Sequence, residues 1–250
     1  MLEITPLTVG LLAMVTAIAT GIGALPFAFR KEWSGAQMGL ANALAAGLMT
    51  AASGLLIWEG VVSMSTTMPH VLTLIGLASG VGFVWATRAV LDRYDDLHVG
   101  DLSGADAAQA IMIMGVMTLH SMTEGIGVGV SYGGGEALGL YVTFAIALHN
   151  VPEGLAIALV LVPRGTSVGR AALWAIASSL PQPILAVPAF LAVETFASAL
   201  PVGLGFAAGA MLWVALRELL PEALEEAPRG RVWTVALASV AIGAVVQWWL

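Results

Sequence analysis

The sequence is short of the residues that a soluble protein uses to cover its surface. Asp, Glu, Lys and Arg together make up 10% of the 250 residues, against about 25% in soluble domains. The chain has no cysteine, which excludes a disulfide-stapled secreted scaffold. Its nine basic residues form no cluster and its net charge is −7, which excludes a nucleic-acid binder. Hydrophobic residues make up 59% and the mean hydropathy is +0.93, which excludes a disordered chain and leaves a polytopic membrane protein.

Eight apolar stretches follow one another along the chain, separated by short polar or Gly- and Pro-rich breaks. Each is long enough to cross a hydrocarbon layer of about 30 Å as a helix that rises about 1.5 Å per residue. We therefore expect an all-α integral membrane protein with eight transmembrane helices in a single polytopic domain over residues 1–250. The stretches run over Thr5–Phe29, Ala36–Trp58, His70–Leu91, Ala105–Ser131, Glu136–Val162, Val168–Val193, Ala199–Leu220 and Val232–Leu250.

The basic residues are distributed unevenly over the breaks. All nine lie in or beside the breaks after the first, third, fifth and seventh stretches, and the other breaks and both termini have none. Because loops rich in Lys and Arg stay in the cytoplasm, the odd-numbered loops are predicted to be cytoplasmic and both termini extracytoplasmic. The nine residues are Arg30, Lys31, Arg88, Arg93, Arg164, Arg170, Arg217, Arg229 and Arg231.

The fourth and fifth stretches contain two copies of one polar pattern. His120 is followed four residues later by Glu124, and His149 by Glu153, with a Gly after each Glu. In a helix, residues i and i+4 lie on the same face, so each His and Glu pair points in one direction. The two His lie 14 and 15 residues from Gly134 in the intervening loop, so antiparallel helices bring them to nearly the same depth. An ionisable group there costs about 2.5–3.5 kcal/mol and needs a partner or a function.

Two imidazoles and two carboxylates at one depth favour an intramembrane metal site over separate structural hydrogen bonds. These ligand types fit Zn²⁺, Fe²⁺, Mn²⁺ or Co²⁺, whereas Mg²⁺ and Ca²⁺ prefer shells made only of oxygen. The column of ligands suits one divalent ion, or two ions that share carboxylates. Met49 in the second stretch is a packing residue by default, with a thioether ligand to a soft metal as the alternative.

Prolines interrupt two of these stretches near mid-membrane. Pro152 has no N–H and frees the carbonyl of Leu148. The segment Ser178–Pro183 contains two further prolines around Gln182. Irregular backbone at membrane depth is tolerated where it is buried in protein or lines a cavity, so we expect the polar side chains of this segment to face the same cavity as the His and Glu pairs.

Other acidic residues receive weaker assignments. Glu218 and Glu222 lie one turn apart beside Arg217, which favours an ion pair or a solvated face over ligands on an exit path. The longest loop, Asp92–Asp106, carries five Asp residues. A solvated turn is the favoured interpretation of that loop, and a weak cation-collecting segment is the alternative.

The paired motifs resemble those of the ZIP (Zrt/Irt-like) divalent metal transporters, especially the GufA-like prokaryotic branch. The segment HNVPEGLAIA, His149–Ala158, is a close match. Eight spans with external termini agree with the family, as does the stretch Ala208–Trp213 followed by Glu218–Glu222. The resemblance covers nearly the whole chain and is most specific in the fourth and fifth helices.

Membership would imply a binuclear metal site between the fourth and fifth helices, with the second and sixth helices contributing. It would also imply a 3+2+3 helix organisation, a homodimer and an elevator-like alternation of a transport bundle. The implied ligands are His120, Glu124, His149 and Glu153 as the principal set, Ser121, Asn150 and Gln182 at the second metal position, and Met49 from the second helix. The family often has Asn where this chain has Ser121 and an acidic residue where it has Gln182, so we expect the second position to bind metal weakly or not at all.

These features predict a transporter of divalent transition-metal ions, with zinc first and iron, manganese or cadmium as other candidates. The resemblance implies movement towards the cytoplasm by alternating access. A non-transporting metal sensor is the alternative, and an intramembrane metalloenzyme is less favoured because His-Glu-x-x-His and Gly-x-Ser-x-Gly motifs are absent. We expect no catalytic residue or cofactor, the metal being substrate, no nucleic-acid partner, and a multi-pass location in the lipid bilayer of a prokaryotic cytoplasmic (inner) membrane.

Overall fold

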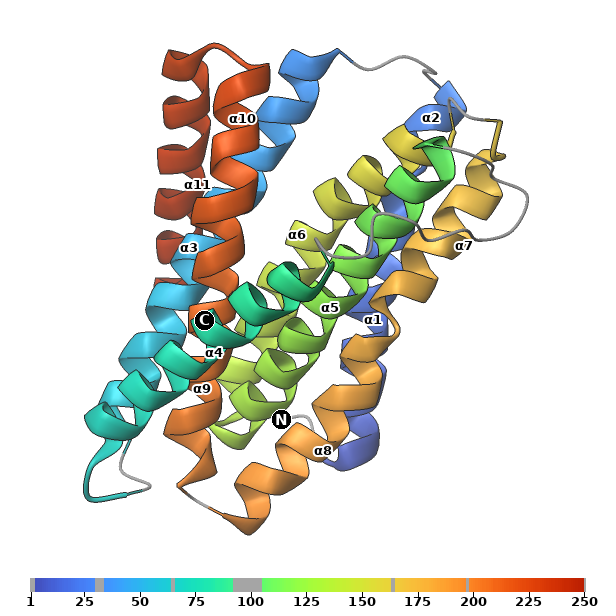
Figure 1. Ribbon diagram of the computed structural model, residues 1–250. Coiled ribbons are helices and arrows are strands. Elements are labelled where there is room, and N and C mark those ends of the chain that lie inside the picture. The colour runs from blue at the N-terminus through green and yellow to red at the C-terminus, as the bar shows by residue number, and fades with distance from the viewer. Residues whose placement is uncertain are drawn as a thin grey trace.

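The computed structural model describes residues 3–29, 34–63, 66–91, 105–162, 165–196 and 198–249, and these residues are almost entirely helical (Figure 1). The described helices form eight rods, one for each predicted stretch. They are α1 (Pro6–Ile22) with α2 (Pro26–Phe29), α3 (Gly35–Val62), α4 (Pro69–Leu91), α5 (Ala105–Gly133), α6 (Glu136–Leu161), α7 (Val168–Ser179) with α8 (Pro181–Thr195), α9 (Ala199–Val214) with a π-helical turn (Ala215–Leu219) and α10 (Leu220–Glu226), and α11 (Arg229–Trp249).

The all-α membrane fold is therefore confirmed, with small differences at the helix ends. Six of the rods are long and apolar enough to cross a membrane by length and hydropathy alone, and α5 and α11 complete the set. The polar cluster in the middle of α5 lowers the hydropathy of that helix. The second rod runs four residues beyond the predicted Trp58, and the seventh runs on to Glu226, because Leu220–Glu226 is rich in helix formers and has a proline at the start of α10.

Proline acts differently in the two stretches that it was predicted to interrupt. The sixth rod is broken as expected, since α7 ends at Ser179 and α8 begins at Pro181. Helix α6, in contrast, continues through Pro152 without a break. Both prolines lie in the bundle formed by α1, α5, α6 and α7–α8, which surrounds the polar residues of the sequence motifs.

The rods pack as two bundles. Helices α1, α5, α6, α7 and α8 contact one another extensively, and so do α3, α4, α9, α10 and α11. In Figure 1 the rods α3, α10 and α11 stand on the left, and α1, α7 and α8 on the right. The bundles meet where α5 lies against α9 and where α3 lies against α6. Any cavity between α5, α6 and α3 is thus formed between the two bundles.

The first three rods and the last three are arranged alike around α5 and α6. Helix α1 packs on α6, and its counterpart α8 packs on α5. Helix α3 contacts α11 and α6, and its counterpart α9 contacts α4 and α5. This pairing is what a 3+2+3 organisation requires. It sets α5 and α6, which carry the two copies of the His and Glu pattern, side by side in the middle of the protein.

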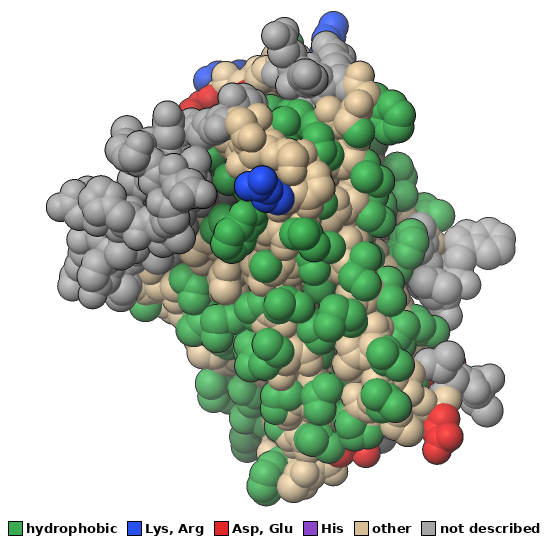
Figure 2. All heavy atoms as spheres, turned by 90° about the vertical axis from the view of Figure 1, so that its right-hand side faces the viewer, with side chains coloured by type: hydrophobic (Ala, Val, Ile, Leu, Met, Phe, Trp, Pro, Cys, Tyr) green, Lys and Arg blue, Asp and Glu red, His purple; other side chains and the backbone are tan. Residues whose placement is uncertain are grey.

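The outer surface is apolar. Figure 2 shows one face on which hydrophobic side chains cover the middle and the few described charged residues lie in its upper part and at its lower end. Leu7, Leu173 and Ile184 are each at least 66% exposed. Large exposed apolar side chains are expected where lipid replaces water as the solvent.

Three described arginines in the first turns of helices lie at the same end of the molecule. Arg170 lies at the start of α7, and Arg229 and Arg231 at the start of α11, both of which are at the upper end in Figure 1. Several other residues used for the orientation lie outside the described residues, namely Arg30, Lys31, Arg93 and Arg164, together with positions 92–104 of the acidic loop. The cytoplasmic assignment of this end stays a prediction.

Glycine allows backbones to touch within each bundle. A Cβ atom at Gly80 of α4 would lie 2.1 Å from the carbonyl oxygen of Phe206 on α9, and one at Gly209 of α9 would lie 2.2 Å from the carbonyl oxygen of Leu77 on α4. Only glycine permits so close an approach of two helices. Helices α4 and α9 therefore form a tight pair.

We predict that Gly80→Ala destabilises the protein, whereas Gly82→Ala on the same helix does not. The alanine at position 80 would force α4 away from a backbone oxygen, an overpacking cost of about 1–3 kcal/mol. A Cβ atom at Gly82 meets nothing within 4 Å, and alanine there has the better helix propensity. Thermal unfolding in detergent, followed by tryptophan fluorescence, measures both variants, and equal midpoints would contradict the backbone contact.

Candidate metal centre

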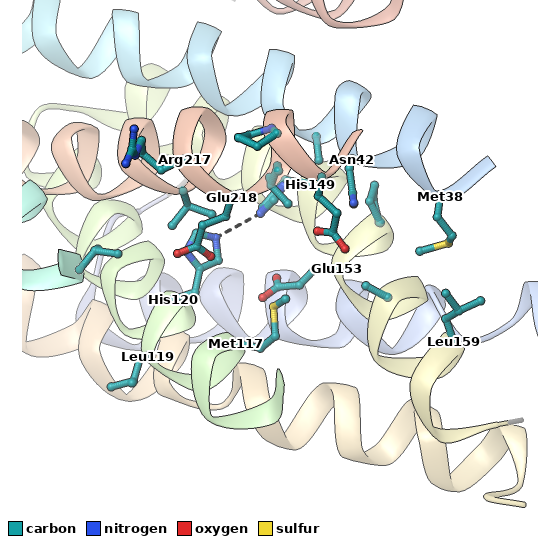
Figure 3. A pocket seen from close by; sticks show the side chains of 18 of the residues that line it. Met38, Asn42, Met117, Leu119, His120, His149, Glu153, Leu159, Arg217 and Glu218 are labelled. Carbon is teal, nitrogen blue, oxygen red and sulfur yellow. Dashed lines mark hydrogen bonds between the residues drawn. The ribbon is translucent and has the colours of Figure 1, made fainter. Parts of the chain in front are cut away.

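Two neighbouring helices supply the four side chains of the repeated motif. His120 and Glu124 lie one turn apart on α5, and His149 and Glu153 lie one turn apart on α6. Their exposed fractions are 6%, 0%, 2% and 6% in the same order. Antiparallel packing of α5 and α6 brings the two His to the same depth, as the spacing around Gly134 predicted. Figure 3 shows the two imidazoles pointing toward each other, joined by a dashed line.

Three potential ligand atoms converge at one point. The Nε2 atoms of His120 and His149 lie 3.3 Å apart, and each lies 3.4 Å from Oε1 of Glu124. In a tetrahedral zinc site with bonds of about 2.0–2.1 Å, neighbouring ligand atoms are about 3.3–3.4 Å apart. The triangle therefore has the dimensions of three corners of such a site.

The hydrogen-bond partners of these residues agree with an ion at this point. Oε1 of Glu124 accepts no hydrogen bond, although it is buried. A buried carboxylate oxygen without a partner is costly unless a cation balances it. The group formed by His120, Glu124 and His149 is compact enough for all three to reach one ion.

Glu153 lies beside this triangle rather than in it. Both of its carboxylate oxygens are buried without a hydrogen-bond partner, and its side chain lines a cavity of about 550 Å³ together with His120 and His149 (Figure 3). The same cavity reaches the exposed residues Glu225 and Glu226 at the end of α10. The cavity thus connects the buried His and Glu residues to one end of the molecule, the upper end in Figure 1.

Comparison with known proteins agrees with the motifs. The profile of the family described as ZIP Zinc transporter matches residues 93–247. The chain is 34% identical to the zinc transporter GufA of Myxococcus xanthus over 246 residues, which are 92% of this chain and 96% of that protein. It is 35% identical to the zinc transporter ZIPB of Bordetella bronchiseptica over 213 residues, 82% of this chain and 69% of that protein. The chain belongs to the ZIP family.

A plant relative covers almost the whole chain as well. The putative zinc transporter At3g08650 of Arabidopsis thaliana is 45% identical over 239 residues, which are 94% of this chain. The chain spans just over a third of that protein, 37% of its length. The match to the two bacterial ZIP proteins over most of their length identifies the GufA-like branch that the helix motifs indicated.

Two of the three residues predicted at the second metal position form a hydrogen-bond network. Nε2 of Gln182 on α8 donates to Oε2 of Glu124 over 2.7 Å. Nδ2 of Asn150 on α6 donates to Oε1 of Gln182 over 3.2 Å and to the backbone oxygen of Thr16 on α1 over 2.8 Å. Ser121 is fully buried, and its hydroxyl has no hydrogen-bond partner. Gln182 is thus occupied by Glu124 and Asn150, whereas Oδ1 of Asn150, like the Ser121 hydroxyl, is buried without a hydrogen-bond partner.

Helix α3 contributes a residue that the sequence motifs did not indicate. Asn42 is 5% exposed and lines the cavity together with Met38 and Ala45. Met49, one turn beyond Ala45, is 1% exposed in the large apolar core cluster and is not among the residues that line the cavity. A thioether ligand from Met49 stays a prediction. A lone Asn inside an apolar stretch was the available signal for Asn42.

Glu218 and Glu222 both line the cavity wall, Glu218 partly buried and Glu222 exposed. Arg217 beside them lies over the ring of Trp213, 5.6 Å from its centroid, a distance typical of a cation–π contact. The choice between a charged face and metal ligands for these two carboxylates stays open in this ZIP protein.

We predict that Glu124→Gln weakens zinc binding by at least about 10-fold, because the neutral amide replaces the charged oxygen at the centre of the triangle. Ser131→Ala on the same helix is the control, since Ser131 is equally buried and bonds only to the backbone oxygen of Val128. Competition of the purified protein with a zinc-chelating dye measures both. Unchanged affinity in Glu124→Gln would exclude this carboxylate as a ligand.

Proposed function

We propose that this ZIP protein carries divalent transition-metal ions, zinc first, across the membrane towards the cytoplasm. The observation that carries the proposal is the triangle of His120, His149 and Glu124, whose ligand atoms have tetrahedral spacing at mid-bundle. Glu153 and then the acidic residues of α10 continue from it along one cavity. The matched bacterial relatives are both named zinc transporters, which supports the same cargo here.

The ligand chemistry supports a transition metal. Two imidazole nitrogens and a carboxylate suit Zn²⁺ and its neighbours in the first transition series, while an all-oxygen shell would be needed to favour Mg²⁺ or Ca²⁺. Glu124 and Glu153 are the buried acidic residues of the described part of the chain. Their two negative charges balance one divalent ion, so a loaded site is neutral in the low-dielectric interior.

The cavity supports alternating access with this conformation open to one side only. From the His pair it extends to the end where α10 and α11 join. On the other side of the pair, α5 and α6 are closed by Val128, Val142 and Ile146, each fully buried. With the orientation predicted from the basic residues, the open side is the cytoplasm. An ion bound from outside therefore requires a second arrangement of the bundles.

The packing supports movement of the bundle of α1, α5, α6, α7 and α8 as one body against the other bundle. Backbone contacts at glycine lie inside the bundles, as between α4 and α9. Across the boundary, a Cβ atom at Gly127 of α5 would meet a side chain only, the Cβ atom of Ala207 on α9, at 3.1 Å. Side-chain contacts without interlocked backbones permit sliding at low cost. We further propose a prokaryotic cytoplasmic membrane, a homodimer, and one polytopic domain.

We predict that zinc flux into liposomes requires the motif. After reconstitution with a zinc-sensitive dye inside, His149→Ala and Glu153→Ala should abolish uptake, because each removes a group that binds the ion along its path. Glu225→Gln, which removes an equal charge from an exposed position on the same cavity, should keep most of it. Parallel assays with Fe²⁺, Mn²⁺ and Cd²⁺ give the ion preference. Zinc binding without flux in the unaltered protein would favour the sensor alternative and reject transport.

Disulfide cross-links should separate movement between bundles from movement within one. The chain has no cysteine, so introduced pairs are unambiguous. We predict that Gly127→Cys with Ala207→Cys, which joins α5 to α9, blocks flux when oxidised and restores it on reduction. Gly133→Cys with Val193→Cys joins α5 to α8 inside one bundle at a similar Cβ separation, 2.8 Å, and should leave flux unchanged. Both separations are shorter than the range of about 3.5–4.5 Å found in disulfides, so each pair can be bridged after a small outward shift. Flux that survives the first cross-link would contradict relative movement at this boundary.

A further inference from the structure

Gln182 lies at the break between α7 and α8, where three other helices meet it. The residue is fully buried. Its backbone touches α5, since a Cβ atom at Gly125 would lie 2.6 Å from the carbonyl oxygen of Gln182. Its side chain reaches Glu124 on α5, Asn150 on α6 and Thr16 on α1. Gln182 therefore links all rods of the bundle that carries the proposed ion site.

The hydrogen bonds give the side-chain amide of Gln182 a single orientation. A backbone carbonyl can only accept, so the contact with the oxygen of Thr16 identifies the NH₂ group of Asn150. That NH₂ group also points to Gln182, which must present its oxygen there. The Thr16 hydroxyl, which has one proton to donate, lies within hydrogen-bond distance of the same oxygen and of the carbonyl oxygen of Ala13, and both of these oxygens are acceptors. The NH₂ group of Gln182 is left facing Glu124.

This orientation divides the two oxygens of Glu124 between two tasks. Oε2 accepts from Gln182 at 2.7 Å, a distance typical of a charge-assisted bond. Oε1 has no donor and faces both imidazoles at 3.4 Å. A carboxylate held in this way offers one oxygen to an ion and cannot bridge two ions through both.

We propose that Gln182 is the positioning residue of the site: it holds Glu124 as a one-oxygen ligand and occupies the place of a second cation, so that the protein binds one divalent ion at a time. The proposal rests on the proposed function for the identity of the ion. The NH₂ group stands where a second ion would have to contact Oε2. Charge balance agrees, because a second divalent ion would leave two uncompensated positive charges beside Glu124 and Glu153 in a buried site.

Ion binding to the purified full chain in detergent tests this role. Equilibrium dialysis with Zn²⁺ and elemental analysis should find one ion per chain in the unaltered protein. Gln182→Ala should still bind one ion, with Kd raised about 10-fold, as for the loss of other groups that orient a ligand. Gln182→Glu removes the donor and adds a negative charge beside Oε2, so it should bind two ions per chain. Thr16→Val, which removes one neighbour of the Gln182 oxygen, should raise Kd by a smaller factor.

Ser179→Ala is the matched control. Ser179 is fully buried at the same helix break, and its hydroxyl lies 2.8 Å from that of Thr20. It therefore also joins the sixth rod to α1, but it does not touch Glu124. Its substitution should leave stoichiometry and Kd unchanged. The visible absorption spectrum of bound Co²⁺, which reports ligand geometry, should change in Gln182→Ala and remain the same in Ser179→Ala.

Each result is decisive. Two ions of comparable affinity in the unaltered protein would overturn the one-ion site. An unchanged Kd and Co²⁺ spectrum in Gln182→Ala, or one ion with unaltered affinity in Gln182→Glu, would overturn the positioning role. If Gln182→Ala does not fold, the nearly isosteric Gln182→Glu and Thr16→Val decide the question. Because these readouts measure binding, absence of flux in liposomes would reject the proposed transport without affecting them.

Discussion

Glu124 is a fully buried carboxylate, and its need for partners organises the centre of this protein. One of its oxygens accepts a hydrogen bond from the side-chain amide of Gln182, and the other faces the imidazoles of His120 and His149. In an apolar bundle no water replaces a missing partner, so His120, one turn away on α5, is joined by His149 from α6 and Gln182 from α8. The partners of Glu124 therefore come from α5, α6 and α8 at one depth. They leave one point, next to Oε1 of Glu124, at which a bound ion would contact this oxygen and both imidazoles.

Close helix packing is what lets so many partners reach that point. Gly125 allows the backbone of α8 to rest on α5 next to Glu124, and the break at Pro181 turns Gln182 into the bundle. Gly154, directly after Glu153, lies against the backbone of Thr20 on α1 in the same way. The glycines that follow each Glu in the two motifs thus hold the neighbouring helices in place, which explains why the repeated pattern includes them.

The cavity adds a direction to this centre. Its wall comes from both bundles, with Asn42 of α3 and Glu218 of the seventh rod lining it together with His120 and His149. The proposed ion ligands lie on one bundle, and the residues that line the cavity between them and solvent lie largely on the other. Relative displacement of the bundles would therefore change what the ion can reach without taking its ligands apart.

Hydropathy, helical period and loop charge are local properties, and they were enough to predict the membrane class, the eight rods and the pairing of His120 with Glu124 and of His149 with Glu153. Polarity at mid-membrane indicated that the segment around Gln182 faces the site, and the resemblance to ZIP transporters implied that Asn150 belongs to it as well. Tertiary packing was needed to show that Gln182 bonds to Glu124, that Thr16 contacts Asn150, that Asn42 lines the cavity, and that Met49 packs in the apolar core cluster. The reason is physical: these relations depend on helix rotation and on contacts between segments up to 166 residues apart, which local periodicity does not encode.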